Sequence, residues 1–485
     1  VDTWATAVAR YGKLSFSAVL EPAIRLAQDG FPVYERLRES LISSFDKFNE
    51  LYPTTAELYY PGGQVPDVGE IWRNPDFAGV LKMMCKAEDG AAGKSRISGI
   101  EAARDAFYKG PIAERIVEFI TSNPVEDASG SAHTGLISYE DMSQWHATVE
   151  EPLTYDYKGL TVHKCPSWTQ GPVFLQQLAI LKDFDLTMMG HNSIEYLHTY
   201  IESAKLAFAD REAYYGDPVF DQVPFEVLLS EGYNRNRRTL IGDKASMNMR
   251  AGDAGNGVPA YAALNVADDN RQALGITARP VNDLGLGHAH VGDTTHLDAI
   301  DIEGNMVAAT PSGGWIGTSP VIKGLGFPIG TRAQMFYLNP QRPNALAGHK
   351  RPRATLTPSL VTEDGAPHMV FGTPGGDMQD QVTLQFFLNY VDFGMNIQEA
   401  LDAPTVFSVH FPSSFYPREA YPGHMAADAR IPSEVIEGLK ERGHIVDNTE
   451  EWSGGKPMGI RLHRDKGVIA GGVAPKGNIG YALGW

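Results

Sequence analysis

Cysteine is scarce in this 485-residue chain, which carries only Cys85 and Cys165. The two residues lie far apart and belong to no Cys-x-x-Cys or Cys/His spacing, so the sequence predicts neither a disulfide framework nor a metal site. We expect two buried free thiols. Long apolar runs are also missing, because no stretch approaches the roughly 18 residues of a membrane-spanning helix. We therefore expect no membrane partner.

Positive charge is in short supply as well. Lys and Arg number 41 against 59 Asp and Glu, which gives a formal net charge of −18 at pH 7. Nucleic acids and anionic membranes attract proteins through clustered Lys and Arg, whereas the acidic residues here are spread along the whole chain. This balance argues against nucleic acid as a partner.

Apolar periodicity predicts helices separated by short strands. The clearest helix covers residues 194–215, with Asn192 as its N-cap and His198 at a surface or an interface. Asp377 is expected to cap a later helix over 378–393. Further helices are expected near 1–31, 173–181, 396–402 and 433–442, and strands at 159–163, 459–463 and 468–471.

Residues 242–293 show no periodicity and are rich in Gly, Asn, Asp and Ala. This composition predicts a mobile linker, and an intact surface loop is the plainer alternative. The linker ends at Asp293, directly before Thr294. A cut at this point would leave a flexible end that can move away from the new terminus.

Thr294 is the residue on which the functional interpretation depends. A Thr hydroxyl is a weak nucleophile unless a base lies beside it, and a free α-amine on the same residue can be that base. The ordinary pKa of such an amine, about 8, suits this role. The amine exists only if the chain is cut before Thr294. The alternative is purely structural: Thr is common in β-strands, so Thr294-Thr295-His296 could simply begin a strand.

Three segments resemble the γ-glutamyltranspeptidase family of N-terminal nucleophile hydrolases, namely 293–296, 301–305 and 372–376. The resemblance runs nearly end to end. It implies an α+β fold, a four-layer αββα sandwich, and a precursor that cleaves itself between Asp293 and Thr294. The expected products are a large subunit (1–293, including the linker) and a small catalytic subunit (294–485). They stay associated as a heterodimer, and pairing of two heterodimers is left open.

The start of the chain departs from this family. Val1-Asp2-Thr3-Trp4 resembles an interior point of the large subunit, so we expect a preceding segment of roughly a quarter of a typical member. No signal peptide is visible at Val1. The compartment, cytoplasmic or periplasmic, is therefore not assigned.

The resemblance also implies which residues support Thr294. Ser312 falls where the family keeps a second hydroxyl, although a Ser in a turn can be purely structural. Gly375 and Gly376 match the glycines whose backbone N–H groups form the oxyanion hole. Upstream, Gln170 lies in a turn that either lines a pocket or is structural.

The substrate-binding positions differ from those of true transpeptidases. The Ser pair that holds an α-carboxylate is replaced by Ala354-Thr355, so one hydroxyl survives. Family contacts to the glutamyl ammonium fall at Gly314, Arg332 and Met335. Arg332 would repel an ammonium but can bind a carboxylate in a bidentate manner. The change resembles the amidohydrolase branch, which includes the oxamate amidohydrolases. A surface or ion-paired role for Arg332 is the alternative.

We therefore predict an autoprocessed amidohydrolase that uses Thr294 to cleave an amide of a small, carboxylate-bearing substrate. The resemblance implies no metal and no organic cofactor. Two alternatives stay open, a γ-glutamyl transpeptidase or glutathione hydrolase and a non-catalytic binding relative.

Overall fold

The computed structural model describes residues 1–91, 93, 95–127, 130–263, 294–313, 316–416, 418–475 and 480–484. The chain divides into two compact units, which are described separately. Unit 1 comprises Val1–Val149 and Gly313–Thr331, and unit 2 comprises Glu150–Ser312 and Arg332–Trp485. Most of the predicted linker, 264–293, lies outside the described residues, so its mobility stays a prediction. Among the helices of the described ranges, none is long and apolar enough to cross a membrane.

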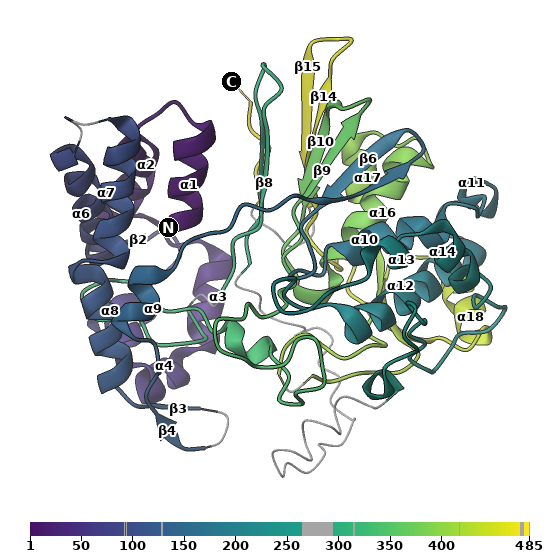
Figure 1. Ribbon diagram of the computed structural model, residues 1–485, viewed down its shortest axis with the longest axis horizontal. Helices are drawn as coiled ribbons and strands as arrows, with labels where there is room; N and C mark the ends of the chain where they lie inside the picture. Colours follow the sequence, from purple (N-terminus) through teal and green to yellow (C-terminus); the bar gives the residue numbers. More distant parts are fainter. Residues whose placement is uncertain are drawn as a thin grey trace. The chain divides into compact units, whose positions relative to one another are not determined.

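Unit 1 is mainly helical (Figure 1). Its first two helices, α1 (Asp2–Tyr11) and α2 (Phe16–Asp29), confirm the helical start predicted from the sequence. The other helices are α3 (Glu35–Ser43), α4 (Phe45–Leu51), α5 (Pro53–Tyr59), α6 (Pro75–Ala91), α7 (Arg96–Tyr108), α8 (Pro111–Ser122) and α9 (Tyr139–Gln144). Two short strand pairs complete the unit, β1 (Phe31–Pro32) with β2 (Ile71–Trp72), and β3 (Val125–Glu126) with β4 (Ala132–His133).

Unit 2 is built on an antiparallel sheet with the strand order β15-β14-β10-β9-β6-β5 (Figure 1). Its strands are β5 (Leu153–Tyr157), β6 (Leu160–Lys164), β9 (Ser359–Glu363), β10 (Ala366–Gly372), β14 (Met458–His463) and β15 (Val468–Val473). Three of them, β6, β14 and β15, confirm the strands predicted at 159–163, 459–463 and 468–471. Strand β10 lies in the interior, where Met369, Val370 and Phe371 are fully buried.

Helices cover one face of this sheet. α10 (Pro172–Leu181) and α16 (Gln379–Val391) pack against β10 through aromatic side chains. The ring of Phe371 lies 5.9 Å from that of Phe174, 5.3 Å from that of Phe386 and 6.0 Å from that of Phe387, measured between centroids. α12 (Ile194–Tyr214) packs on α10, and α17 (Ile397–Asp402) packs on β15.

A β-hairpin, β7 (Leu297–Ile300) with β8 (Met306–Ala309), packs on the opposite face. Consecutive strand side chains point to opposite faces, so position 372 faces away from the helices that Phe371 contacts. A Cβ atom on Gly372 would overlap the ring of His296, the residue before β7. Glycine at position 372 therefore allows the hairpin to approach the sheet closely.

The rest of unit 2 surrounds these layers. A second sheet contains β11 (Val406–Ser408), β12 (His424–Asp428) and β13 (Ile445–Thr449), in which β11 and β12 run antiparallel and β12 and β13 parallel. The remaining helices are α11 (Leu186–Met189), α13 (Phe225–Leu228), α14 (Glu231–Arg238) and α18 (Ser433–Glu441), and short 3-10 turns cover Ala260–Ala263, Arg332–Met335 and Gly376–Met378. Cys85 in unit 1 and Cys165 in unit 2 are free, as predicted, but each residue is only partly buried.

Helix α12 corrects two local predictions. Its N-cap is Ser193, whose side chain accepts from the backbone N–H of Tyr196, and not Asn192, which adopts a φ of 54°. His198 was expected at a surface or an interface but is buried, with 1% of its area exposed. Its Nε2 donates to the carbonyl of Gly242 over 2.7 Å, so its Nδ1 accepts from His444 Nε2 over 2.8 Å.

Burial keeps three imidazoles of unit 2 neutral. Desolvation lowers the pKa of His198, and it lowers that of His444 to about 2 and that of the nearby His410 to about 3. The same groups have a pKa of about 6.5 in an unfolded chain. Below pH 6.5 the unfolded chain binds protons that the folded protein does not, so the free energy of unfolding decreases as the pH falls from 6.5 towards 3.

We expect His444→Gln, which keeps a donor for His198, to make unit 2 less sensitive to acid. Removing one such imidazole should reduce the pH dependence of the free energy of unfolding by about 1.4 kcal/mol per pH unit below pH 6. Urea unfolding between pH 4 and pH 7 measures this slope. The exposed His349, replaced by Asn, is the control, and equal slopes for the two variants would contradict the assignment.

Candidate active site

The register of the β7–β8 hairpin brings two predicted catalytic residues together. Leu297 pairs with Ala309, and the pairing continues beyond the strands, because Thr295 N–H donates to the carbonyl of Pro311 over 3.1 Å. The same register places Thr294 opposite Ser312. Their side-chain oxygens lie 2.8 Å apart, within hydrogen-bonding distance. Either hydroxyl can be the donor.

Arg332 joins this hydroxyl pair. Its guanidinium donates to the Oγ atom of Ser312, and it lies 5.5 Å from the ring centroid of Phe415. A guanidinium has no acceptor, so the Ser312 oxygen accepts this bond. Accepting a bond from a cation makes the hydroxyl proton of Ser312 a stronger donor. The structure thus brings together Thr294, Ser312 and Arg332. Two other predicted positions, Asp293 and Gly314, lie outside the described residues.

Gly375 and Gly376 form the turn between β10 and α16. Both have positive φ angles, 136° and 59°, which favour glycine. The turn continues as a single 3-10 turn, Gly376–Met378, at whose start backbone N–H groups have no partner within the helix. Gly372, which lies against the His296 ring, is three residues before Gly375, so strand β10 links the β7–β8 hairpin to this turn.

Gln170, in the turn that precedes α10, anchors the Gly375–Gly376 turn. Its Nε2 donates to the carbonyl of Gly376 over 3.2 Å, while its Oε1 accepts from Arg211 over 2.8 Å. The side chain is fully buried. Gln170 was expected either to line a pocket or to be structural. The structure supports the structural role, because its amide group binds the Gly376 carbonyl and Arg211 within the protein.

Asp377 does not cap the following helix, contrary to the sequence prediction. Helix α16 begins at Gln379, and the Asp377 carboxylate instead accepts from Ser414, from the backbone N–H over 2.8 Å and from Oγ over 2.6 Å. It also contacts the Arg211 guanidinium. Burial alone would raise the pKa of Asp377, but the charge of Arg211 and the bonds from Ser414 hold that pKa below its usual range.

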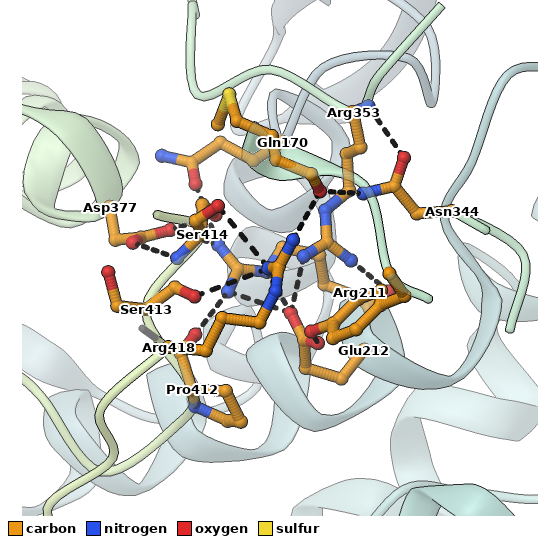
Figure 2. A network of polar contacts seen from close by, with 12 residues as sticks. Gln170, Arg211, Glu212, Asn344, Arg353, Asp377, Pro412, Ser413, Ser414 and Arg418 are labelled. Carbon is orange, nitrogen blue, oxygen red and sulfur yellow. Dashed lines mark hydrogen bonds and ion pairs between the residues drawn. The ribbon is translucent and has the colours of Figure 1, made fainter. Parts of the chain in front are cut away.

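Figure 2 shows that Arg211 is the centre of a larger buried network. Glu212 lies 2.9 Å from Arg211 and 2.6 Å from Arg353, and these charges outweigh desolvation to hold the pKa of Glu212 at about 2. Arg418 donates to the carbonyl of Met335, the last residue of the 3-10 turn that carries Arg332, and to that of the following Phe336. The cations Arg211, Arg353 and Arg418 and the anions Glu212 and Asp377 are all part of this network.

Thr355 lies beside the Gln170 turn. The preceding residue, Ala354, donates its N–H to the carbonyl of Trp168 over 2.7 Å. Thr355 has only 1% of its area exposed, and within the described part of the chain its Oγ1 has no hydrogen-bond partner. A buried hydroxyl without a protein partner is available to a ligand or to water.

Sequence reasoning missed Arg211, Ser414 and Arg418. No local motif marks them, because their partners are far away in sequence: Arg211 reaches Gln170 across 41 residues and Asp377 across 166. Segment 207–218, which contains Arg211, also resembles the γ-glutamyltranspeptidase family, and this similarity was the one available signal for Arg211.

In the described ranges, no group of three His, Cys, Asp or Glu side chains could hold a metal ion.

We expect Gln170→Met to slow turnover without preventing folding. Losing the bond to the Gly376 carbonyl lets the turn relax and misaligns its N–H donors, so kcat per titrated active site should fall about tenfold, or about 1.4 kcal/mol. Gln385→Met is the matched control, because Gln385 is also buried and holds backbone groups of Val406 away from the turn. Equal kcat values for the two variants would show that Gln170 does not support the turn.

Comparison with known proteins places the chain. The sequence pattern of the family described as gamma-glutamyltranspeptidase matches residues 1–483. The glutathione hydrolase-like YwrD proenzyme of Bacillus subtilis (strain 168) is 30% identical over 499 residues, covering 100% of this chain and 79% of that protein.

Two solved structures are similar over nearly the whole chain. LmbA2991T421A superimposes with a TM-score of 0.90 at 40% identity, covering 100% of this chain and 81% of the other. Cephalosporin acylase from Bacillus halodurans gives a TM-score of 0.77 at 28% identity, covering 98% and 75%. These similarities confirm the predicted α+β fold class of the N-terminal nucleophile hydrolases. The chain belongs to the gamma-glutamyltranspeptidase family, and is an autoprocessed hydrolase that acts on amides.

Proposed function

We propose that the chain cleaves itself between Asp293 and Thr294 and then uses Thr294 to hydrolyse small amides that carry a carboxylate. The main support is the 2.8 Å contact between the hydroxyls of Thr294 and Ser312 at the open end of the hairpin. Cleavage there would give a large fragment, 1–293, and a catalytic fragment, 294–485, that begins with the nucleophile.

In the proposed reaction the free amine of Thr294 takes the proton from its own Oγ as this oxygen attacks the amide carbonyl. The carbonyl oxygen becomes an oxyanion, which backbone N–H groups of Gly375 and Gly376 stabilise. The ammonium then returns the proton to the leaving amine, and an acyl ester on Thr294 remains. Water, deprotonated by the same amine, attacks this ester. The bond between the acyl carbon and Thr294 Oγ then breaks, the ammonium returns the proton to Oγ, and the acid is released.

Ser312 serves both the self-cleavage and the turnover. Before the cut the nitrogen of Thr294 is a peptide amide, which cannot act as a base, whereas the bond to Ser312 is already in place. Because Arg332 donates to Ser312, the Ser312 hydroxyl is a stronger donor to a Thr294 oxygen that gains negative charge.

The charges around the site favour an anionic substrate. Arg332 contacts Ser312 and so lies one side chain away from the nucleophile. Behind the turn, the buried guanidinium of Arg418 donates to the backbone carbonyls of Met335 and Phe336, and desolvation lowers its pKa. An ammonium beside these groups would be repelled and a carboxylate attracted. This supports a dicarboxylic acid monoamide over a γ-glutamyl donor, and hydrolysis over transfer to an amino acid.

We expect the intact mass of the purified wild type to show two fragments that sum to the chain, split at Asp293–Thr294. Thr294→Ala should remain a single chain, since it removes the attacking oxygen. Thr294→Ser should still cleave, because it keeps a hydroxyl and an α-amine. Cleavage of the Ala variant at the same bond would refute Thr294 as the self-cleaving nucleophile.

The substrate class can be tested with two anilides that differ in one group. Glutaryl-p-nitroanilide carries the carboxylate of γ-glutamyl-p-nitroanilide but lacks its α-ammonium. We expect a higher kcat/KM for the glutaryl compound, because Arg332 repels the α-ammonium that only the γ-glutamyl compound carries. Arg332→Gln should reduce this preference about tenfold, or roughly 1.4 kcal/mol, while the loss of the bond to the shared carboxylate lowers kcat/KM for both compounds. The ratio cancels any effect of Arg332 on Ser312.

Arg235→Gln is the control for lost positive charge, because Arg235 is exposed on α14 and pairs with Glu231. A preference for the γ-glutamyl compound, with stimulation by a dipeptide acceptor, would instead favour a transpeptidase. Self-cleavage without release of nitroaniline from either compound would exclude this substrate class.

A further inference from the structure

The β7–β8 hairpin, which follows Thr294, has a polar face towards the six-stranded sheet. Side chains at 294, 296 and 298 point to the same face because strand positions alternate, and residues 312, 310 and 308 lie opposite them. Neighbouring positions show the alternation: Thr295 and Leu297 are exposed, while His296 is buried. This face packs on the six-stranded sheet, where apolar side chains would be the ordinary choice.

Two hydrogen bonds connect the polar side chains. His296 Nδ1 lies 2.8 Å from Thr310 Oγ1, across the hairpin, and His296 Nε2 lies 2.9 Å from Asp298 Oδ1, along the strand. The imidazole and carboxylate are almost completely shielded, with 0% and 2% of their side-chain areas exposed. A carboxylate accepts, so Nε2 carries a proton and the ring orientation is fixed at both nitrogens.

The third contact of the imidazole is with the sheet. The ring lies against Gly372, where no larger residue could be accommodated without displacing it. Gly372 ends β10 and leads through Thr373 into Gly375. His296 therefore contacts, at once, the hairpin that carries Thr294 and Ser312 and the strand that leads to the oxyanion turn.

This arrangement is costly for folding alone. Burial raises the pKa of Asp298, although the bond from His296 opposes the shift. The second carboxylate oxygen, Oδ2, has no hydrogen-bond partner in the described part of the chain. A buried pair of polar groups is often no more stabilising than apolar residues of similar size, so the fold does not require this pair.

We propose that His296 and Asp298 are positioning residues, which hold the Thr294–Ser312 hydroxyl pair at a fixed place relative to the Gly375–Gly376 turn. The inference rests on the proposed role of Thr294 as nucleophile. Neither residue touches the substrate. Asp298 fixes the imidazole, the imidazole holds Thr310 and the hairpin at Gly372, and the hairpin holds Thr294.

The decisive comparison is between Asp298→Ala and Asp298→Asn. The Ala variant loses the acceptor for His296, so kcat per titrated active site should fall about 10- to 100-fold, as for other misplacements of reacting groups, with KM changed less than twofold. The Asn variant can keep its oxygen on His296 and turn its NH₂ towards the site of Oδ2, which has no partner. It should retain kcat within about threefold.

Thr310→Val is a second probe, because Val keeps the strand preference and the side-chain shape but removes the hydroxyl. We expect a fall in kcat of about tenfold. If Asp298→Ala fails to fold, the kcat of Thr310→Val tests the proposal in its place. The control is Asp447→Ala in the pair of Asp447 and His424, which has the same 2.9 Å bond length on β12 and β13. It should leave kcat unchanged.

Wild-type kcat in a folded Asp298→Ala variant, or in Thr310→Val, would overturn the proposal. Equal losses for Asp298→Ala and Asp298→Asn would also overturn it, because they would show a need for the charge and not for an acceptor. Failure of the proposed function is seen separately, as self-cleavage of Thr294→Ala measured in parallel.

Discussion

The antiparallel register of β7 and β8 determines where the candidate nucleophile lies. A slip of one residue would turn Thr294 and His296 from the sheet to the solvent and separate Thr294 from Ser312. The turn that closes the hairpin fixes this register. Asp301 accepts from Asn305, from the backbone N–H over 2.9 Å and from Nδ2 over 2.7 Å, and Gly304 supplies a φ of 88°. A short polar turn thus sets the alignment of the site at the other end of the hairpin.

The buried ionic network provides the second constraint. Arg211 is fully buried and binds Gln170, Asp377, Glu212 and the carbonyl of Pro412. Removing one partner from such a network leaves an uncompensated buried charge, which typically costs about 3–5 kcal/mol. The network connects α12, the Gly376 turn and the segment after β11, so the turn cannot move without disturbing all three.

Much of the local structure could be predicted from the sequence, because apolar periodicity and capping act over a few residues. The helices near 173–181 and 433–442, observed as α10 (Pro172–Leu181) and α18 (Ser433–Glu441), and the strand pair β14–β15 are examples. The N-cap of α12 was misplaced by one residue because Asn192 and Ser193 are both good caps, and only the backbone angles of the folded chain distinguish them.

The site was predicted in part. The family resemblance identified Thr294, Ser312 and Arg332, which the structure brings together, but composition and spacing could not show that Arg332 binds Ser312. Asp377 follows a local pattern typical of a cap and instead binds Ser414, 37 residues away. The burial of His198 depends on His444, 246 residues along the chain. Such contacts arise from tertiary packing, which local patterns do not encode.

The contact between Asp377 and Ser414 links selectivity to rate. Phe415, the next residue, lies under the guanidinium of Arg332, so the segment 412–416 contacts both the group proposed to bind the substrate carboxylate and the residue beside the oxyanion turn. A protein that changes this segment to admit a different acyl group also changes the anchoring of Gly376. On the proposed roles of Arg332 and Gly376, substrate range and catalytic speed are therefore coupled, and a new specificity acquired through this loop would require compensating changes around Arg211.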